Sequence, residues 1–192
     1  MSGKNTTQPT LVMGVGGAGS HMLNLLARQP LASSLRLICV NTDQGALSNI
    51  GLSHLFIGAS GQPAVTLDKG KEAAIHSSTD IARILNDAGR LIVMAGLGGG
   101  TGSGAAPEIV RIAMNLGLEV RACVAMPAQW EGRQRETQAS TGLAALQRQK
   151  CTVTVVYFDE LSATLPPSTT MEEYSSVMTQ VLIEKGFFET QS

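Results

Sequence analysis

One short stretch decides how this sequence is interpreted: residues 98–104, which read Gly-Gly-Gly-Thr-Gly-Ser-Gly. An apolar run comes directly before it, and apolar residues at helical spacing follow it between positions 109 and 116. The stretch is therefore expected to join a strand to a helix. Such a run of glycines costs backbone entropy and has no expected packing purpose, so it predicts a concave nest of amides around phosphate oxygens. Thr101 and Ser103 are expected to add hydroxyl donors, and Pro107 to lie in the first helical turn.

A second glycine-rich turn lies near the start of the chain, where residues 14–19 read Gly-Val-Gly-Gly-Ala-Gly. It also follows an apolar run and opens a helix, and it matches the dinucleotide fingerprint G-x-G-x-x-G, with Asp43 near the place of the ribose acid. This turn alone favours a Rossmann oxidoreductase. Two such turns on neighbouring strand ends instead indicate a polyphosphate held from two sides. No Lys stands where a P-loop requires one.

Candidate strands and helices alternate along the chain. The expected strands are 10–15, 35–40, 54–57, 91–96, 119–126 and 152–158, and the expected helices are 18–28, 81–88 with Thr79 as N-cap, 109–116, 133–149 and 171–185. Because most strands are continuously apolar, we expect an α/β fold with a doubly wound, mostly parallel sheet and helices on both faces. Residues 58–71 are expected to form a loop. Residues 1–9 are expected to be a flexible tail, and residues 10–192 a single nucleotide-binding domain.

Composition excludes several classes of function. The chain has 192 residues, 15% of them charged, and a net charge of −1, so no basic field exists to hold a nucleic acid. Its three cysteines lie in or beside apolar runs without zinc-ligand spacing, so we expect reduced thiols and no metal site. The polar N-terminus predicts no secretory signal, and no apolar run approaches the ~20 residues of a membrane span. These features predict a cytoplasmic protein without a transmembrane segment.

The motifs together resemble the tubulin/FtsZ superfamily. The GGGTGSG stretch at 98–104 is similar to that family's signature loop, and GVGGAGSH at 14–21 is similar to its first phosphate loop. NTDQGAL at 41–47 resembles its second loop, and AMPAQWEGRQR at 125–135 resembles the loop that holds the ribose. The similarity runs in order from about residue 10 to 185. The chain therefore resembles the N-terminal GTP-binding domain of an FtsZ-like cell-division protein, in a short form that lacks the C-terminal domain.

The resemblance implies a ligand and a set of site residues. The ligand would be GTP or GDP, with Mg²⁺ possible beside the triphosphate. The expected nucleotide-binding residues are Gly16, Gly17, Ala18, Asn41, Asp43, Gly98, Gly99, Gly100, Thr101, Gly102, Glu131, Arg135 and Tyr174. Glu131 would accept a hydrogen bond from the ribose, and Arg135 would lie near the sugar or the base. From the residues alone, a solvated helix start is the better interpretation of both side chains.

Three departures from the family shape the expected function. The family's acidic catalytic loop lies on a second domain that this sequence does not include, so no catalytic residue is expected. Tyr174 matches the aromatic residue of the base-reading helix, but residues 178–180 replace the Asn-Asp pair that reads guanine, so base specificity stays open. The loop over the terminal phosphate is shortened, and its lysines are interpreted as solvent-exposed. Trp130 is expected to pack beside the sugar loop.

These observations support one function and two alternatives. The first is a GTP-binding module, associated with a filament or with cell division, that cannot complete its own hydrolytic site and binds an FtsZ-like filament or forms a homo-oligomer. The first alternative is a GTPase that is active only when a partner supplies the catalytic loop. The second alternative is the Rossmann dinucleotide-binding oxidoreductase indicated by the first glycine turn.

Overall fold

The structure, a computed structural model, describes residues 8–59 and 61–188, so residues 1–7 of the predicted tail lie outside the described residues. Its centre is a six-stranded sheet in the order β3-β2-β1-β4-β5-β6, in which every pairing is parallel. The strands are β1 (Thr10–Val15), β2 (Leu35–Asn41), β3 (His54–Phe56), β4 (Arg90–Gly96), β5 (Glu119–Met126) and β6 (Thr152–Tyr157). The predicted α/β class is confirmed.

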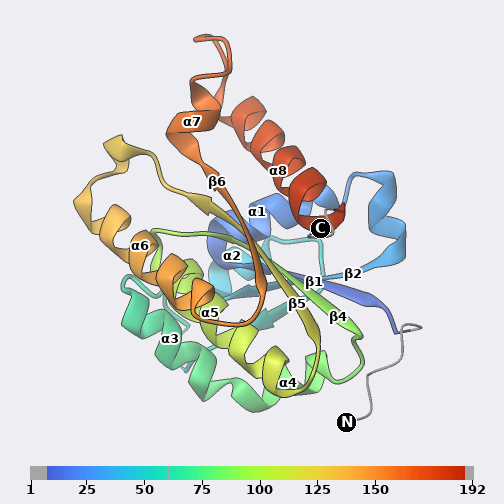
Figure 1. The fold of residues 1–192 in the computed structure, drawn as a ribbon. Coiled ribbons are helices and arrows are strands. Elements are labelled where there is room, and N and C mark those ends of the chain that lie inside the picture. The colour runs from blue at the N-terminus through green and yellow to red at the C-terminus, as the bar shows by residue number, and fades with distance from the viewer. Residues whose placement is uncertain (1–7, 60, 189–192) are drawn as a thin grey trace.

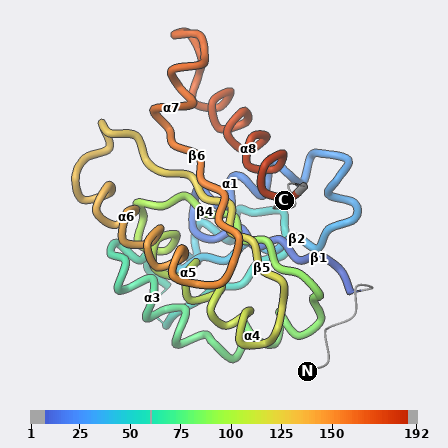
Figure 2. The backbone as a smooth tube through the Cα atoms, viewed as in Figure 1, coloured from blue at the N-terminus to red at the C-terminus, as the bar shows by residue number. Residues whose placement is uncertain are grey.

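Helices cover both faces of the sheet (Figures 1 and 2). They are α1 (Gly16–Leu26), α2 (Gln44–Ser48), α3 (Leu67–His76), α4 (Ser78–Leu85), α5 (Gly100–Asn115), α6 (Arg133–Gln147), α7 (Phe158–Ser162) and α8 (Met171–Phe188), with short 3₁₀ helices at Pro30–Ser34 and Gln129–Glu131. Helices α1 and α8 pack on one face, and α5 packs on the other with α3, α4 and α6 around it.

The apolar pattern of the strands follows from this layering. In β1, Leu11 and Met13 face the core under α5, whereas Val12 faces the second core under α1 and α8. All three side chains are fully buried. A strand with both faces covered needs apolar residues at every position, which is why the strands read as continuous apolar runs.

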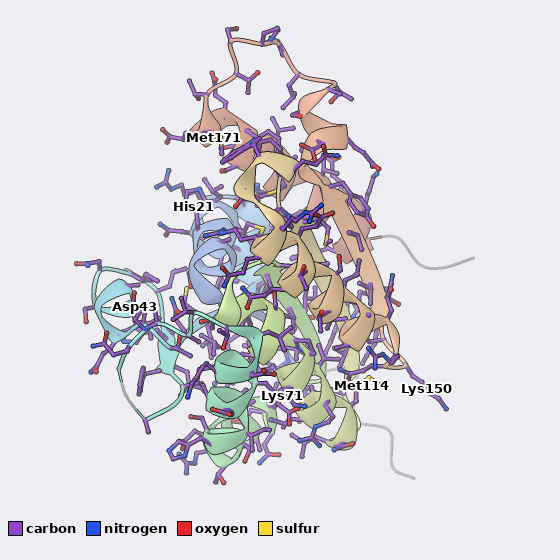
Figure 3. The ribbon with its side chains drawn as sticks, turned by 90° about the vertical axis from the view of Figure 1, so that its left-hand side faces the viewer. His21, Asp43, Lys71, Met114, Lys150 and Met171 are labelled. Carbon is purple, nitrogen blue, oxygen red and sulfur yellow. The ribbon has the colours of Figure 1, made fainter. Side chains whose placement is uncertain are left out.

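The residues before α5 fold differently from the sequence expectation. Helix α3 begins at Leu67, so the predicted loop over residues 58–71 ends at Thr66, whose hydroxyl caps the helix by accepting from the Lys69 amide. Lys69 and Lys71 lie on the exposed side of α3, and their charge made the segment resemble a loop in sequence. Figure 3 labels Lys71 on this side. The N-cap of α4 is Ser77 rather than Thr79.

Glycines in the 98–104 stretch do serve packing, contrary to the sequence expectation. A Cβ on Gly104 would clash with the carbonyl of Leu67, and a Cβ on Gly70 would clash with the carbonyl of Gly100. Helices α3 and α5 therefore approach each other backbone to backbone. Because α5 already begins at Gly100, Pro107 lies inside the helix and not in its first turn.

Candidate functional site

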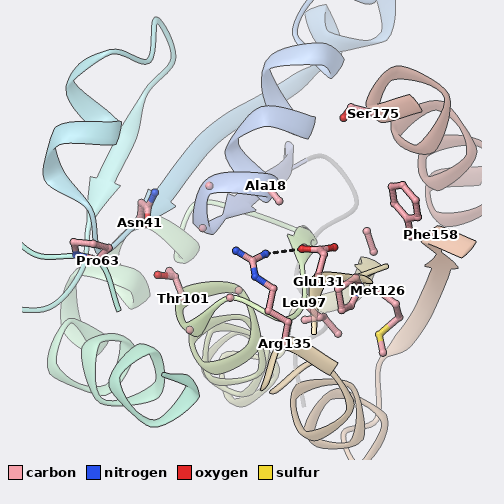
Figure 4. A pocket seen from close by; sticks show the side chains of 18 of the residues that line it. Ala18, Asn41, Pro63, Leu97, Thr101, Met126, Glu131, Arg135, Phe158 and Ser175 are labelled. Carbon is pink, nitrogen blue, oxygen red and sulfur yellow. Dashed lines mark hydrogen bonds and ion pairs between the residues drawn. The ribbon is translucent and has the colours of Figure 1, made fainter. Parts of the chain in front are cut away.

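The candidate site lies at the carboxyl edge of the sheet, where β1 pairs with β2 on one side and β4 on the other. The chain order reverses between these neighbours, and ligands of doubly wound sheets bind at such a switch point. Helix α1 starts directly after β1. Helix α5 is separated from β4 by three residues, Leu97, Gly98 and Gly99. A pocket of about 480 Å³ opens between these helix starts and extends to α8 (Figure 4).

The first glycine turn presents bare backbone to this pocket. Gly16 has a φ of +75°, which lets β1 turn directly into α1 without strain. The N-cap position, Val15, makes no side-chain capping bond, and the first turn of α1 carries no acidic residue. A Cβ on Gly17 would meet no atom within 4 Å. The first amides of α1 therefore lack a side-chain partner and lie beside open space.

The second glycine turn is built in the same way. Its N-cap, Gly99, makes no side-chain capping bond, and α5 also lacks an acidic residue in its first turn. A Cβ on Gly99 would likewise meet nothing within 4 Å. Ser103 does not line the pocket: its hydroxyl accepts from the Gly98 amide at 2.8 Å and holds the turn in shape. The expectation that Ser103 donates to a ligand is therefore wrong.

The two turns touch each other. A Cβ on Gly16 would lie 3.2 Å from the amide nitrogen of Gly102, so the starts of α1 and α5 stand side by side. The hydroxyl of Thr101 lies 2.8 Å from that of Thr42, which also accepts from the Ala64 amide at 2.9 Å. Two adjacent helix N-termini without side-chain caps make this part of the pocket suited to an anion.

Charged side chains lie at the middle of the pocket. Glu131 accepts from the Ala128 amide at 2.9 Å through one oxygen and pairs with Arg135 at 2.8 Å through the other (Figure 4). Among the lining residues, Arg135 carries the positive charge, and Asp43 and Glu131 carry the negative charges. Asp43 caps α2 by accepting from the Ala46 amide at 3.0 Å.

Aromatic rings form the far end of the pocket. The ring centroids of Phe158 and Tyr174 lie 4.0 Å apart, with an angle of 34° between the ring planes. The ring of Trp130 meets that of Phe158 edge to face, with centroids 6.0 Å apart. Tyr174 is only 4% exposed and donates its hydroxyl proton to the Phe158 carbonyl. Burial, followed by the nearby charge of Asp159, raises the pKa of Tyr174 to about 12. Trp130 is 71% exposed, so the expectation of a packed tryptophan is wrong.

The structure brings together most residues that the sequence singled out. All of the expected site residues except Gly98, which is buried behind its turn, line this one pocket: Gly16, Gly17, Ala18, Asn41, Asp43, Gly99, Gly100, Thr101, Gly102, Glu131, Arg135 and Tyr174. Sequence reasoning missed Pro63 and Ala64 from the loop before α3, and Phe158. Phe158 directly follows β6, and its place at a strand's carboxyl end was an available signal.

The described residues were also examined for metal-binding clusters and for membrane-spanning helices. Within residues 8–59 and 61–188, no group of three or more His, Cys, Asp or Glu side chains is arranged to hold a metal ion. No helix in the same described part of the chain is both long and apolar enough to cross a bilayer.

Comparisons with known proteins agree with this geometry. The model of the Tubulin/FtsZ family, GTPase domain, matches residues 9–166. The cell division protein FtsZ of Helicobacter pylori strain J99 is 35% identical over 179 residues, which are 90% of this chain and 46% of that protein. FtsZ of Pseudomonas aeruginosa is 35% identical over 144 residues, 70% of this chain and 35% of the relative. The chain thus spans less than half the length of these curated relatives.

Solved structures show the same fold. A structure described as an empty FtsZ dimer from M. jannaschii superposes with a TM-score of 0.83 at 28% identity, covering 94% of this chain and 54% of the other. A GTPgS-bound protofilament of CetZ2 from Haloferax volcanii superposes with a TM-score of 0.80 at 22% identity, covering 92% of this chain and 56% of the other, a likeness of fold alone.

Proposed function

Because this chain belongs to the tubulin/FtsZ family and matches its GTPase domain, we propose that it binds GTP or GDP in the pocket between α1, α5 and α8. The observation that carries the proposal is the pair of helix N-termini, each without a side-chain cap, that meet at Gly16 and Gly102. Amides at such positions, together with the positive ends of two helix dipoles, hold phosphate oxygens without any lysine.

The proposed orientation follows from the order of groups along the pocket. The phosphate chain would lie on residues 16–18 and 99–102, with Asn41 and Asp43 at its side. The side-chain oxygen of Asn41 already accepts from the Thr42 amide at 2.9 Å, so its NH₂ group is the part available to a ligand. The ribose would lie by Glu131 and Arg135, and the base would reach Tyr174 on α8.

Mg²⁺ would accompany a bound triphosphate. This ion keeps several waters and is bound mainly by phosphate oxygens and one or two carboxylates. The described residues offer no three-ligand cluster, but the pocket carries the carboxylate of Asp43 close to the proposed phosphate site. The phosphates themselves would therefore supply most of the ligands.

We further propose that the chain cannot complete its own hydrolytic site. A general base must reach the attacking water within hydrogen-bond distance. The carboxylates among the described lining residues are Asp43, which caps α2, and Glu131, which is bonded to the Ala128 amide and to Arg135. Glu131 is thus engaged through both oxygens, and Asp43 is the carboxylate proposed to meet Mg²⁺, so neither is left to take a proton from the attacking water. Bound GTP would accordingly persist when the chain is alone.

The pocket's outer edge favours docking on a filament partner of the FtsZ type. Trp130 and Met171 line the pocket and are 71% and 58% exposed. Large apolar side chains at such a rim are typical of contact surfaces. The chain would then act as a filament-associated or cell-division-related module rather than as a self-assembling polymer. The second candidate, a GTPase completed in trans, uses the same open edge. The oxidoreductase alternative is not retained, because both glycine turns share one pocket.

Titration calorimetry with GDP and with GTP plus Mg²⁺ tests nucleotide binding. We expect saturable binding of both, and no heat of binding with either would contradict nucleotide binding.

Light scattering with GTP tests whether the chain is a filament-associated module, because robust filaments from this chain alone would rule that out. Phosphate release from mixtures with an added FtsZ protein, compared with that FtsZ alone, separates the two candidates: release above that of FtsZ alone supports the GTPase in trans, and no excess in any mixture argues against it. The predicted cytoplasmic location stays a prediction.

A further inference from the structure

The end of the pocket formed by α8 and Phe158 has a composition that bears on which base it accepts. Resting on the proposed function, we propose that this end, the base end, does not select guanine: it takes purine nucleotides of guanine, hypoxanthine and adenine with similar affinity. The residues that form it are Phe158, Met171, Tyr174, Ser175 and Met178.

Selecting guanine requires acceptors placed for its ring N1–H and its exocyclic NH₂ group. A protein site that offers matched hydrogen-bonding groups discriminates strongly, because an unmatched buried polar group loses its bonds to water. A site without such groups discriminates weakly, since an apolar pocket cannot strongly reject a ligand that differs by one polar group. The inventory of polar atoms at the base end therefore decides its selectivity.

The polar atoms at the base end are already used within the protein. The Tyr174 hydroxyl donates to the Phe158 carbonyl at 3.2 Å. The Ser175 hydroxyl donates to the Met171 carbonyl at 2.8 Å, which leaves lone pairs that accept from any base donor. Met178, one turn after Tyr174 on the same face of α8, has only a thioether. A single neutral hydroxyl is a weak basis for choosing among purines.

The carboxylates of α7 and of the first turn of α8 do not line the pocket. Glu173 accepts from the backbone amide and the hydroxyl of Thr170 at 2.8 and 2.9 Å, which caps the start of α8. Asp159 accepts from the Gln129 amide at 3.2 Å. Neither these two nor Glu172 lines the pocket. The acceptor that guanine's paired donors need is therefore absent from the described lining of the base end.

The aromatic rings supply binding energy that does not depend on the base. The ring centroids of Phe158 and Tyr174 lie 4.0 Å apart with the planes tilted by 34°, and Trp130 stands edge-on to Phe158 with most of its surface exposed. Stacking on aromatic rings tolerates every base, because each base has a π-face. The base end is thus built for contact area rather than for reading hydrogen bonds.

The test is a set of calorimetric titrations of the full chain with GDP, IDP and ADP. We expect dissociation constants that agree within about tenfold, as weak apolar discrimination requires. A preference for GDP of about 100-fold or more over ADP and IDP would overturn the inference and leave the proposed function standing. Failure to bind any of the three would overturn both.

A gain-of-selectivity variant gives a second test. Met178→Asp places a carboxylate on the pocket face of α8, and we expect it to bind GDP about tenfold or more tightly than IDP, which lacks only the exocyclic NH₂ group. Ser176→Asp is the matched control, because it adds the same charge to an exposed position of α8 outside the pocket, and we expect it to leave selectivity unchanged. Should Met178→Asp not fold, Ser175→Asp serves, because Ser175 is half-buried on the same face. A folded carboxylate variant without gain would contradict the assignment of this end to the base.

Discussion

The hydroxyl of Thr42, at the end of β2, lies 2.8 Å from the hydroxyl of Thr101 in the first turn of α5. Both side chains are buried, and Thr42 also accepts from the Ala64 amide at 2.9 Å. Three segments far apart in sequence therefore meet at one oxygen atom: the end of β2, the loop before α3 and the glycine-rich start of α5. This contact fixes the side of the pocket where the phosphates are proposed to bind.

Replacing Thr42 tests this contact. Thr42→Val keeps the side chain's shape but leaves the Ala64 amide without its acceptor, so we expect the free energy of unfolding to fall by about 1–3 kcal/mol. Thr141→Val is the control, because Thr141 is exposed and bonds only within α6, so its effect should stay within about 0.5 kcal/mol. Urea unfolding measures both. Equal effects of the two substitutions would contradict the role of Thr42.

The glycines with open space around them separate ligand contact from folding. Gly17→Ala and Gly99→Ala, combined, should leave stability unchanged, because each methyl group meets nothing within 4 Å. The same variant should bind GDP about tenfold or more weakly, a loss of ~1.4 kcal/mol, since the methyl groups would compete with phosphate oxygens. Gly51→Ala is the matched control: it is equally open but lies outside the pocket. Unchanged GDP affinity in the double variant would count against the phosphate site.

Gly102 behaves differently, because its missing side chain is a packing requirement. A Cβ on Gly102 would clash with the carbonyl of Gly96, so Gly102→Ala should reduce stability by about 1–3 kcal/mol even without nucleotide. Thermal unfolding of the nucleotide-free protein measures this loss. A Gly102→Ala variant as stable as the parent would show that the turn has more room than the structure gives it.

Helix α8 and strand β5 also approach closely at a glycine, away from the pocket. A Cβ on Gly186 would clash with the thiol of Cys123, so Gly186→Ala should destabilise the protein by about 1–3 kcal/mol. Adding Cys123→Ala removes the obstructing sulfur, and the double variant should be more stable than the sum of the two single effects predicts. Strict additivity in a double-mutant cycle would contradict the contact.

Alkaline pH should weaken the fold through Cys123. Burial raises the pKa of its thiol from about 9 to about 12, so between these values the folded state holds a proton that the unfolded state has lost. Stability is therefore complete below pH 9 and falls as pH rises through this window. Denaturant unfolding at a series of pH values measures the slope. Cys123→Ala should reduce the slope without abolishing it, because the raised pKa of Tyr174, about 12, adds to the same loss of stability. Identical slopes in the two proteins would contradict the role of Cys123.

Much of this fold could be predicted because its strands are buried on both faces. The apolar runs before the two glycine turns became β1 and β4, since parallel central strands leave no position for polar residues. Helix α3 escaped prediction because Lys69 and Lys71 made an amphipathic helix resemble a loop. Pro107 was misplaced because α5 starts inside the glycine run, where close contact between helices requires the absence of side chains.

The parts of the site that backbone chemistry defines could be predicted from the sequence. The parts that depend on tertiary contacts could not. Gly16 and Gly99 could be found because a turn that exposes amides needs glycine. Thr42 could not, since its role depends on a hydroxyl 59 positions away in sequence. Ser103 and Thr101 look alike in sequence, yet one side chain points inward to its own turn and the other lies on the pocket wall.

Both glycine turns are proposed to hold one phosphate chain. A titration of ¹⁵N-labelled protein with GDP, followed by amide resonances, tests it most directly. We expect the amides of residues 16–18 and 99–102 to shift together and fit one dissociation constant, while that of Gly117, beyond the other end of α5, does not move. A response confined to one turn, or two turns that saturate at different GDP concentrations, would contradict it.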